Sequence, residues 1–390
     1  MIFAGKALVC MVWLFWVMII DNSVYGSPPN ARIDDNINQL VQQLEKLKAL
    51  KLRTTGELEE YNPTYGTTFN RVMKRGYIIC GTNDEFPGFS QEKWTNEEGN
   101  KWVGFDVDIC RAVAAAVFGD SEAIEFEVVN GKTRFEFLID GSIDILSAAT
   151  TYTYTRNVLK KLEFMPTTYY DGQGFIVRKT LGVSSAKQMH GARICFSGTG
   201  TAAKNIEDFM KLHGISYIPV AVPHNEKTKN VYKRGGCDMY GTDRSGLASN
   251  RLSFDDPNRH MILPEIISKE PLGPVVRYGD QKWSDIVRWT VYVLFIAEEM
   301  EINSNNIDKM KNNIDPYIQR FMGELNGIDH PHLGAKLGLD AKWSYNIIKQ
   351  VGNYKEIYER NVGKDTPIGL ERGLNKLYIH GGLLYAPPLK

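Results

Sequence analysis

Residues 124–146 read IEFEVVNGKTRFEFLIDGSIDIL, and this stretch decides the fold class. It opens with a β-rich run at 124–129, continues with a helical pattern at 133–139 that ends at Gly141, and closes with a second β-rich run at 143–146. A strand, a helix and a strand in such close succession predict a parallel β-α-β unit.

The same alternation continues on both sides of this unit. Upstream, the sequence predicts a strand at 77–80 and a helix at 106–118. Downstream it predicts a second unit, with strands at 192–196, 217–222 and 237–240 and helices at 201–212 and 227–234. The two units share a short motif: GSID, which ends at Asp144 in the first unit, is similar to GCD, which ends at Asp238 in the second. We expect an α/β protein with two lobes, each a mainly parallel sheet covered by helices.

Two short segments, 169–174 and 269–274, lie between the units and after the second one. They are predicted to be crossover strands that form a hinge, with a ligand cleft between the lobes. The predicted long helix at 281–300 then packs on the first lobe. The expected domains are a signal peptide at 1–26, a helical extension at 27–67, the first part of lobe 1 at 68–170, lobe 2 at 171–270, and the return to lobe 1 with a C-terminal extension at 271–390.

Composition excludes several classes of protein. The 390 residues are 43% hydrophobic and 24% charged with a net charge of +0, which is typical of globular proteins and gives no positive field for nucleic acid.

Lys6 followed by an apolar run at 7–20 is typical of a secretory signal, with cleavage expected near Gly26; an uncleaved anchor is the alternative. The repeat at 33–47 predicts an amphipathic helix whose partner the sequence does not identify.

Four cysteines remain after the leader. In an exported protein an even number favours disulfides, and the pairings within the lobes are Cys80 with Cys110 and Cys195 with Cys237; free buried thiols are the alternative. No cysteine or histidine spacing is typical of a metal site, so we expect no metal and no cofactor.

The stretch GTGTAA at 198–203 follows a predicted strand and opens a helix, as a dinucleotide-binding motif would. That motif also needs an acidic residue after the next strand, where this chain has Pro223. We therefore reject dinucleotide binding. The backbone N–H groups of this helix start, with the hydroxyls of Thr199 and Thr201, are instead suited to an anion such as a carboxylate.

Two charged residues follow strands that should end at the cleft. Arg156 comes after the strand at 143–146 and a threonine-rich stretch that includes Thr151, and its guanidinium is suited to a carboxylate; a solvated surface arginine is the alternative. Asp243 follows the strand at 237–240 in the second lobe, where it could also be a helix N-cap. One cation and one anion on facing lobes complement a zwitterion, so a free amino acid is the expected ligand.

With these segments identified, the chain resembles the periplasmic solute-binding proteins of general and polar L-amino-acid ABC transporters. The resemblance covers about 68–390 and rests on GFDVDICRAV at 104–113, YYDGQG at 169–174, LPEIISKEPLG at 263–273, DIVRW at 285–289 and the segment 363–388. It implies a type II binding-protein fold, no catalysis, a periplasmic location, and delivery of ligand to an inner-membrane permease and its ATPase.

The resemblance also implies roles for individual residues. Arg156, Thr151 and the turn at 199–201 would hold the α-carboxylate of the ligand, and Asp243 would hold its α-ammonium. Asn83 and Phe86 would line the side-chain pocket. This chain departs from the pattern of close relatives at two places. It has Ala148-Ala149 where they have Arg-Asn, and Gly200 where they have a threonine. The range of ligands that it binds is therefore open.

The expected mechanism is capture by hinge closure, because only the closed form pairs both charges of the ligand. Two alternatives stay open at this point. One is a periplasmic enzyme on the same scaffold, such as a dehydratase, and the other is a sensory amino-acid-binding module.

Overall fold

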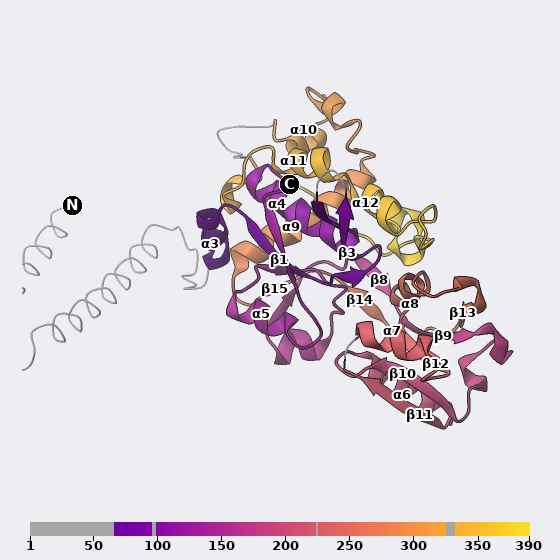
Figure 1. The fold of residues 1–390 in the computed structure, drawn as a ribbon. Coiled ribbons are helices and arrows are strands. Elements are labelled where there is room, and N and C mark those ends of the chain that lie inside the picture. The colour runs from indigo at the N-terminus through magenta and orange to yellow at the C-terminus, as the bar shows by residue number, and fades with distance from the viewer. Residues whose placement is uncertain (1–65, 96–98, 224, 325–331) are drawn as a thin grey trace, which may run out of the picture. The chain divides into compact units, whose positions relative to one another are not determined.

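The computed structural model describes residues 66–95, 99–223, 225–324 and 332–390 (Figure 1). The predicted signal peptide and the predicted amphipathic helix at 33–47 lie outside these residues. Within the described ranges, no helix combines the length and the apolar character that crossing a bilayer requires.

Lobe 1 is built on a five-stranded sheet with the order β5-β1-β6-β15-β7. Its strands are β1 (Ile78–Thr82), β5 (Ile124–Val128), β6 (Ile145–Leu146), β7 (Leu162–Phe164) and β15 (Val275–Arg277). Strands β5, β1 and β6 are parallel, whereas β15 is antiparallel to both of its neighbours.

Lobe 2 has a second five-stranded sheet with the order β11-β10-β12-β9-β13. Its strands are β9 (Gln173–Arg178), β10 (Ala192–Ser197), β11 (Tyr217–Val222), β12 (Met239–Asp243) and β13 (His260–Ile262). Three parallel strands are again followed by one antiparallel strand, β9. The predicted fold of two mainly parallel, helix-covered sheets is confirmed, with one antiparallel strand in each.

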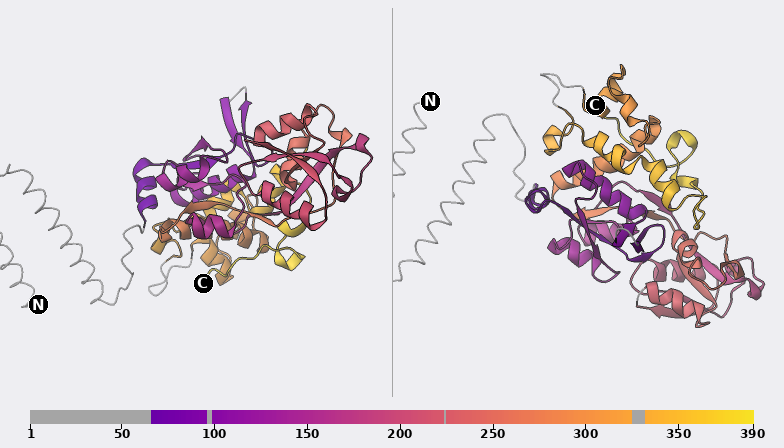
Figure 2. Two further views of the ribbon diagram at one scale, coloured as in Figure 1. Left: turned by 90° about the horizontal axis from the view of Figure 1, so that it is seen from below. Right: turned by 45° about the horizontal axis from the view of Figure 1, so that its top comes forward.

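The two predicted crossovers are strands β8 (Tyr169–Asp171) and β14 (Glu270–Leu272), which pair antiparallel between the lobes. Figure 1 labels β8 and β14 between the two sheets, and Figure 2 shows the two lobes in two further views. Asp171 and Glu270 are direct neighbours in this pairing, so two carboxyl groups lie side by side at the link.

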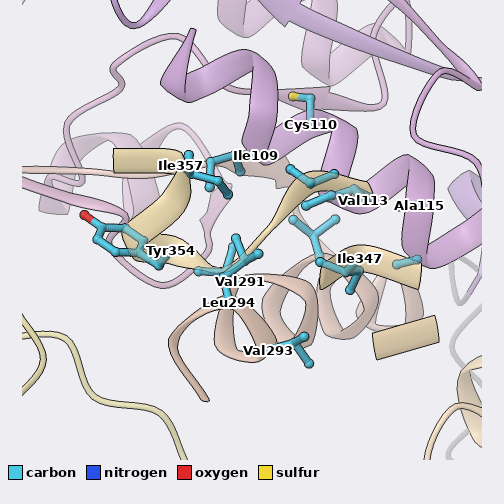
Figure 3. Packing of buried hydrophobic residues seen from close by; sticks show 14 of the residues in the cluster. Ile109, Cys110, Val113, Ala115, Val291, Val293, Leu294, Ile347, Tyr354 and Ile357 are labelled. Carbon is cyan, nitrogen blue, oxygen red and sulfur yellow. The ribbon is translucent and has the colours of Figure 1, made fainter. Parts of the chain in front are cut away.

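Helices cover both sheets. They are α3 (Thr67–Arg75), α4 (Phe105–Phe118), α5 (Arg134–Asp140), α6 (Ala202–Leu212), α7 (Asn225–Lys233), α8 (Arg244–Arg251), α9 (Gln281–Glu299), α10 (Pro316–Met322), α11 (Trp343–Val351) and α12 (Tyr354–Asn361). The predicted helix at 281–300 is α9, and it packs against α4 of lobe 1, with α11 and α12 beside both (Figure 3). Val113, Val291 and Ile347 from three of these helices are fully buried together, so the C-terminal segment extends the core of lobe 1.

One element of lobe 1 was not predicted. Strands β2 (Glu85–Phe86), β3 (Ser90–Thr95) and β4 (Gly99–Val103) form a separate three-stranded antiparallel sheet. Its strands contain Gln, Glu, Lys and Asn and lack a clear apolar alternation, so the usual strand signal is weak. Pairing between neighbouring strands forms this sheet despite its composition.

The two aspartates of the shared motif make the same contacts in the two sheets. Asp144 donates its backbone N–H to the carbonyl of Ile79 in β1 (2.9 Å) and accepts the N–H of Ile79 on its carboxylate (2.8 Å). Asp238 does the same with Arg193 in β10, at 2.9 and 3.0 Å. An acidic side chain therefore aligns β6 with β1 in lobe 1 and β12 with β10 in lobe 2.

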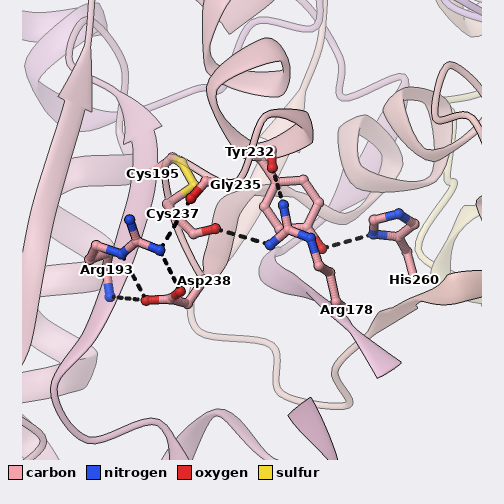
Figure 4. Close-up of a disulfide and its surroundings, with 8 residues drawn as sticks. All are labelled: Arg178, Arg193, Cys195, Tyr232, Gly235, Cys237, Asp238 and His260. Atoms are coloured by element: carbon pink, nitrogen blue, oxygen red, sulfur yellow. Dashed lines mark hydrogen bonds and ion pairs between the residues drawn. A yellow bond between two sulfur atoms is a disulfide. The ribbon is translucent and has the colours of Figure 1, made fainter. Parts of the chain in front are cut away.

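Both predicted disulfides are present. Cys80 of β1 is bonded to Cys110 of α4, with Cα atoms 6.4 Å apart, and Cys195 of β10 is bonded to Cys237, with Cα atoms 5.8 Å apart. Figure 4 shows the second disulfide beside the contact between Arg193 and Asp238. Each disulfide joins the central one of the three parallel strands of its sheet to a neighbouring segment, so it limits the freedom of the unfolded chain around that strand.

Candidate ligand cleft

A cleft of about 1020 Å³, including the part open to solvent, lies where the strands of the two sheets end. Lobe 1 contributes residues that follow β1, β5 and β6, and lobe 2 contributes residues that follow β10 and β12. All eight residues that the sequence proposed for ligand binding line this cleft: Asn83, Phe86, Ala149, Thr151, Arg156, Thr199, Thr201 and Asp243.

Arg156 lies in a short π-helical turn, Thr155–Leu159, at the lobe 1 wall of the cleft. The residue is only 7% exposed, so the alternative of a solvated surface arginine is wrong. Its Nη1 donates to the carbonyl oxygen of Thr151 at 2.7 Å, which orients the guanidinium. Burial lowers the pKa of Arg156, and the carboxylates of Glu270 and Asp243 partly oppose this.

Asp243 is the last residue of β12 and lies on the lobe 2 wall. It has the N-cap position of α8, but its side chain makes no capping hydrogen bond, so the capping role is wrong. Burial raises the pKa of Asp243 well above its ordinary value, and the nearby carboxylates Glu270 and Asp171 add to this effect. A half-buried carboxylate that caps no helix is suited to a cationic ligand group.

The turn before α6 contributes both predicted threonines, which have different contacts. The hydroxyls of Thr199 and Ser197 lie 3.1 Å apart at the end of β10. Thr201 donates its hydroxyl to Glu270 of the hinge strand β14 at 3.2 Å, and Glu270 also accepts from Asn205 and Ser268. Because the hydroxyl hydrogen of Thr201 is used by the hinge, the turn offers an anion mainly backbone N–H groups and Thr199.

A buried carboxyl group holds the loop around Ala149. Ala149 has a φ of 43°, in the left-handed region that costs energy for a residue with a Cβ atom. Its N–H donates to Asp106 at 2.8 Å, and Ser147 donates its hydroxyl to the same carboxyl at 3.0 Å. Burial raises the pKa of Asp106 to about 6. Asp106 therefore keeps a strained loop in place at the edge of the cleft.

Phe86 and Asn83 come from the segment after β1. The Phe86 ring stacks on Phe89 with centroids 4.6 Å apart, which fixes an aromatic surface in the cleft. Asn83 lines the same wall.

Several lining residues were missed. Arg134 opens α5 directly after the loop that follows β5, so the rule that selected Arg156 also selects Arg134. Glu85 lies in the unpredicted sheet and forms an ion pair of 3.3 Å with Lys229 of α7, between the lobes. Ser249 of α8 donates to the carbonyl of Pro87 at 2.9 Å, also between the lobes. No sequence signal indicates these contacts between lobes, because they depend on how two separate segments meet.

The described part of the chain contains no group of three or more His, Cys, Asp or Glu side chains arranged to hold a metal ion. The charges that face the cleft are those of arginine and carboxylate side chains.

Residues 78–364 match the family model of bacterial extracellular solute-binding proteins, family 3. The chain belongs to this family. It is 47% identical to the general L-amino acid-binding periplasmic protein AapJ of Rhizobium johnstonii, over 83% of this chain and 93% of that protein. It is 43% identical to the glutamate/glutamine/aspartate/asparagine-binding protein BztA of Rhodobacter capsulatus, over 83% of this chain and 94% of that protein.

A solved structure supports the same conclusion. The chain is similar to an ABC transporter periplasmic binding protein from Brucella ovis with glutathione bound, with a TM-score of 0.78 and 43% sequence identity, over 82% of this chain and 98% of that chain. By their names, these relatives are a periplasmic amino-acid-binding protein, a second amino-acid-binding protein and an ABC transporter periplasmic binding protein, and no comparison supports the enzyme or the sensory alternative.

Proposed function

We propose that this protein captures free L-amino acids in the periplasm by hinge closure and delivers them to an inner-membrane permease and its ATPase. The observation that carries the proposal is the placement of Arg156 and Asp243 on opposite walls of one cleft. Neither side chain forms an ion pair with any other described residue. A zwitterion supplies both missing partners at once.

Closure follows from the energetics of charge burial. Moving an ammonium and a carboxylate out of water is costly unless each is paired and hydrogen-bonded. When the lobes are apart, the ligand contacts only one wall, so only one of its two charges is paired. When the cleft is closed, the ligand contacts both walls and both charges are paired. The ligand therefore binds the closed form better and shifts the population toward it. The hinge would be β8 and β14, with lobe 1 at 68–170 and 271–390 and lobe 2 at 171–270.

The remaining proposed contacts divide by ligand group. Thr151, Thr199 and the turn at Thr201 would assist Arg156 with the α-carboxylate, and Asn83, Phe86 and Ala149 would meet the ligand side chain. Residues 1–26 would direct export to the periplasm. The names of the relatives, which include a periplasmic amino-acid-binding protein and components of ABC transporters, support the location and the transporter partners.

The test is a thermal-shift screen of the mature protein against the twenty amino acids, followed by titration calorimetry. A ligand at 100 times its dissociation constant stabilises the folded state by about 2.7 kcal/mol, which shifts the melting temperature measurably. We expect several L-amino acids to bind with affinities near micromolar, about −8 kcal/mol, and D-amino acids to bind weakly or not at all. If no amino acid shifts the melting temperature, the proposal is wrong.

A further inference from the structure

The first turn of α8 is held by the hinge strand β8 and by the residue that follows it. Arg244 and Ser245 are the first two residues of this helix. The N–H of Arg244 donates to the carbonyl oxygen of Gly172 at 2.9 Å, and the N–H of Ser245 donates to the carboxylate of Asp171 at 3.1 Å. The helix start therefore takes its first two acceptors from the link between the lobes.

Asp243 precedes this turn and has the position from which a side chain ordinarily caps a helix. An aspartate at this position accepts the N–H of the second or third helical residue. The second residue is Ser245, whose N–H Asp171 already accepts, and the Asp243 side chain makes no capping hydrogen bond. Asp243 instead lines the cleft. Asp171 thus makes the capping contact of α8 that Asp243 would otherwise make.

The two carboxyl groups lie close together. Asp171 is the last residue of β8, and Asp243 pairs in register with Gln173, which opens β9 two residues later. Burial raises the pKa of Asp243, and the charges of Glu270 and Asp171 raise it further, as expected for neighbouring carboxyl groups. Asp171 is not one of the described residues that line the cleft. It is therefore placed to act on Asp243 rather than on a ligand.

Glu270, the neighbour of Asp171 on β14, makes different contacts. Its carboxylate accepts from Thr201 and Asn205, at the start of α6, and from Ser268. Because these donors use its oxygens, Glu270 does not replace Asp171 at α8. Each of the two hinge carboxyl groups therefore holds one helix of lobe 2.

We propose that Asp171 is a positioning residue for ligand binding. By accepting the N–H of Ser245, it leaves the Asp243 carboxylate at the cleft, where that carboxylate meets the α-ammonium of the ligand. If the acceptor at position 171 is lost, Asp243 turns to cap α8 and the ammonium loses its partner. This inference rests on the proposed function and adds to it a residue that does not contact the ligand.

Matched ligand pairs isolate the ammonium contact. An L-amino acid and its α-hydroxy analogue differ only in the group that Asp243 would bind. The pairs are L-alanine with L-lactate, L-leucine with L-2-hydroxyisocaproate, L-phenylalanine with L-phenyllactate, and L-glutamate with L-2-hydroxyglutarate. In the pair that binds best, titration calorimetry of the mature wild-type protein should show a preference of about 100-fold for the amino acid, because a hydroxyl group cannot form the ion pair.

The variant Asp171→Ala removes the acceptor for the N–H of Ser245. We expect affinity for the amino acid to fall by about 10-fold and affinity for the hydroxy analogue to change by less than about 2-fold, which reduces the preference. Asp171→Asn can turn its amide oxygen to the same N–H and should keep the preference within about 3-fold of wild type. Asp171→Val suits a β-strand and also lacks an acceptor, so it gives the same readout if the alanine variant does not fold.

Two controls show whether Asp171 acts through Asp243. In the background of Asp243→Asn, the change Asp171→Ala should lower the preference no further, since the carboxylate on which it acts is gone. Glu265→Ala removes another capping carboxylate of lobe 2, which accepts the N–H of Ala186 at 3.1 Å at the start of the 3-10 helix Ala186–Gln188. Glu265 is not among the described residues that line the cleft, so both affinities should stay within about 2-fold of wild type.

The outcomes separate this inference from the proposed function. If no amino acid binds the wild-type protein, the proposed function fails, and Asp171 has no ligand site to position. If amino acids bind and Asp171→Ala weakens both members of a pair by the same factor, Asp171 acts on the fold or the hinge alone. This inference is then overturned while the proposed function stands. A preference that is unchanged in Asp171→Ala, or lost to the same extent in Asp171→Asn, overturns it as well.

Discussion

The two lobes share one plan and differ at the edge that meets the cleft. Each sheet has three neighbouring parallel strands beside an antiparallel one, a disulfide on the central parallel strand, and an aspartate that aligns this strand with a parallel neighbour. At the cleft, however, lobe 1 presents two guanidiniums, and lobe 2 presents a carboxylate and hydroxyl groups. A repeated fold thus provides two walls of similar geometry, and a few residues after the strands give them opposite charge.

The largest loss of ligand affinity is expected from removing the charge of Arg156 on the lobe 1 wall. Arg156→Ala removes the proposed partner of the α-carboxylate, which every amino acid has. We expect affinity for all amino-acid ligands to fall by at least about 1000-fold, equivalent to ~4 kcal/mol, because a ligand charge would be buried without a partner. Titration calorimetry measures this, with circular dichroism as the control for folding. Near-normal affinity for any amino acid would contradict the role of Arg156.

The aspartates that the lobes share allow a comparison of stability. The Asp144 side chain is fully buried and accepts from Arg71 and Arg75 as well as from the N–H of Ile79. The Asp238 side chain is 32% exposed, and its partner Arg193 is 44% exposed. We expect Asp144→Ala to cost about 3 kcal/mol because it leaves buried donors without an acceptor, and Asp238→Ala to cost about 1 kcal/mol.

Unfolding in urea measures both variants with the disulfides intact. Lobe 2 contains no tryptophan between 171 and 270, whereas the indole of Trp283 in lobe 1 donates to the Asp144 carbonyl at 2.8 Å. Tryptophan fluorescence therefore reports on lobe 1, and circular dichroism reports on both lobes. Equal losses of stability in the two variants would show that burial does not distinguish the two aspartates.

Removing the charge of Asp243 on the lobe 2 wall should reduce ligand affinity less than removing that of Arg156. Asp243→Asn keeps an oxygen that can accept from the ligand ammonium but removes the charge, so we expect a loss of about 30-fold, ~2 kcal/mol. Because burial raises the pKa of Asp243, the ligand-free protein keeps a proton there to higher pH than an ordinary aspartate does. The ammonium binds the ionised form, so wild-type affinity should rise with pH through this range and binding should release a proton.

Calorimetry in two buffers with different ionisation enthalpies counts the released proton. The Asn variant should lose that proton release. If it keeps the wild-type pH dependence, another group near the cleft is responsible, of which Asp171, with a pKa raised to about 6, is the first to examine.

The regular parts of this molecule could be predicted from sequence. Strands such as β11 and helices such as α4 have strong local signals, and Arg156 and Asp243 follow from the rule that parallel strands end at a ligand cleft. Arg134 obeys the same rule, but it opens a helix where a charged residue has an ordinary structural explanation. The position of Ala149 in the left-handed region depends on Asp106, more than forty residues earlier, and no local pattern reveals it.

The contacts between lobes were the hardest to predict, and they give the smallest expected effect. Glu85 of β2 and Lys229 of α7 are joined by one ion pair between the lobes, in which the Glu85 side chain is 57% exposed and the Lys229 side chain 15%. The pair can form only while the lobes are together, so it should favour the closed form. A pair whose carboxylate is exposed contributes little, so Glu85→Gln should weaken ligand binding by only about 2- to 3-fold, ~0.5 kcal/mol, at low salt.

Salt dependence distinguishes this contribution from a direct contact with the ligand, since Glu85 also lines the cleft. At high ionic strength salt screens the exposed carboxylate of the pair, so the variant and wild type should bind equally. Lys229→Gln should give the same small loss, and the double variant should lose no more than either single one, because all three remove one interaction. Lys204→Gln is the control, since its ion pairs with Glu207 and Asp208 lie within α6. A loss that persists at high salt, or that adds in the double variant, would mean that Glu85 acts on the ligand rather than on closure.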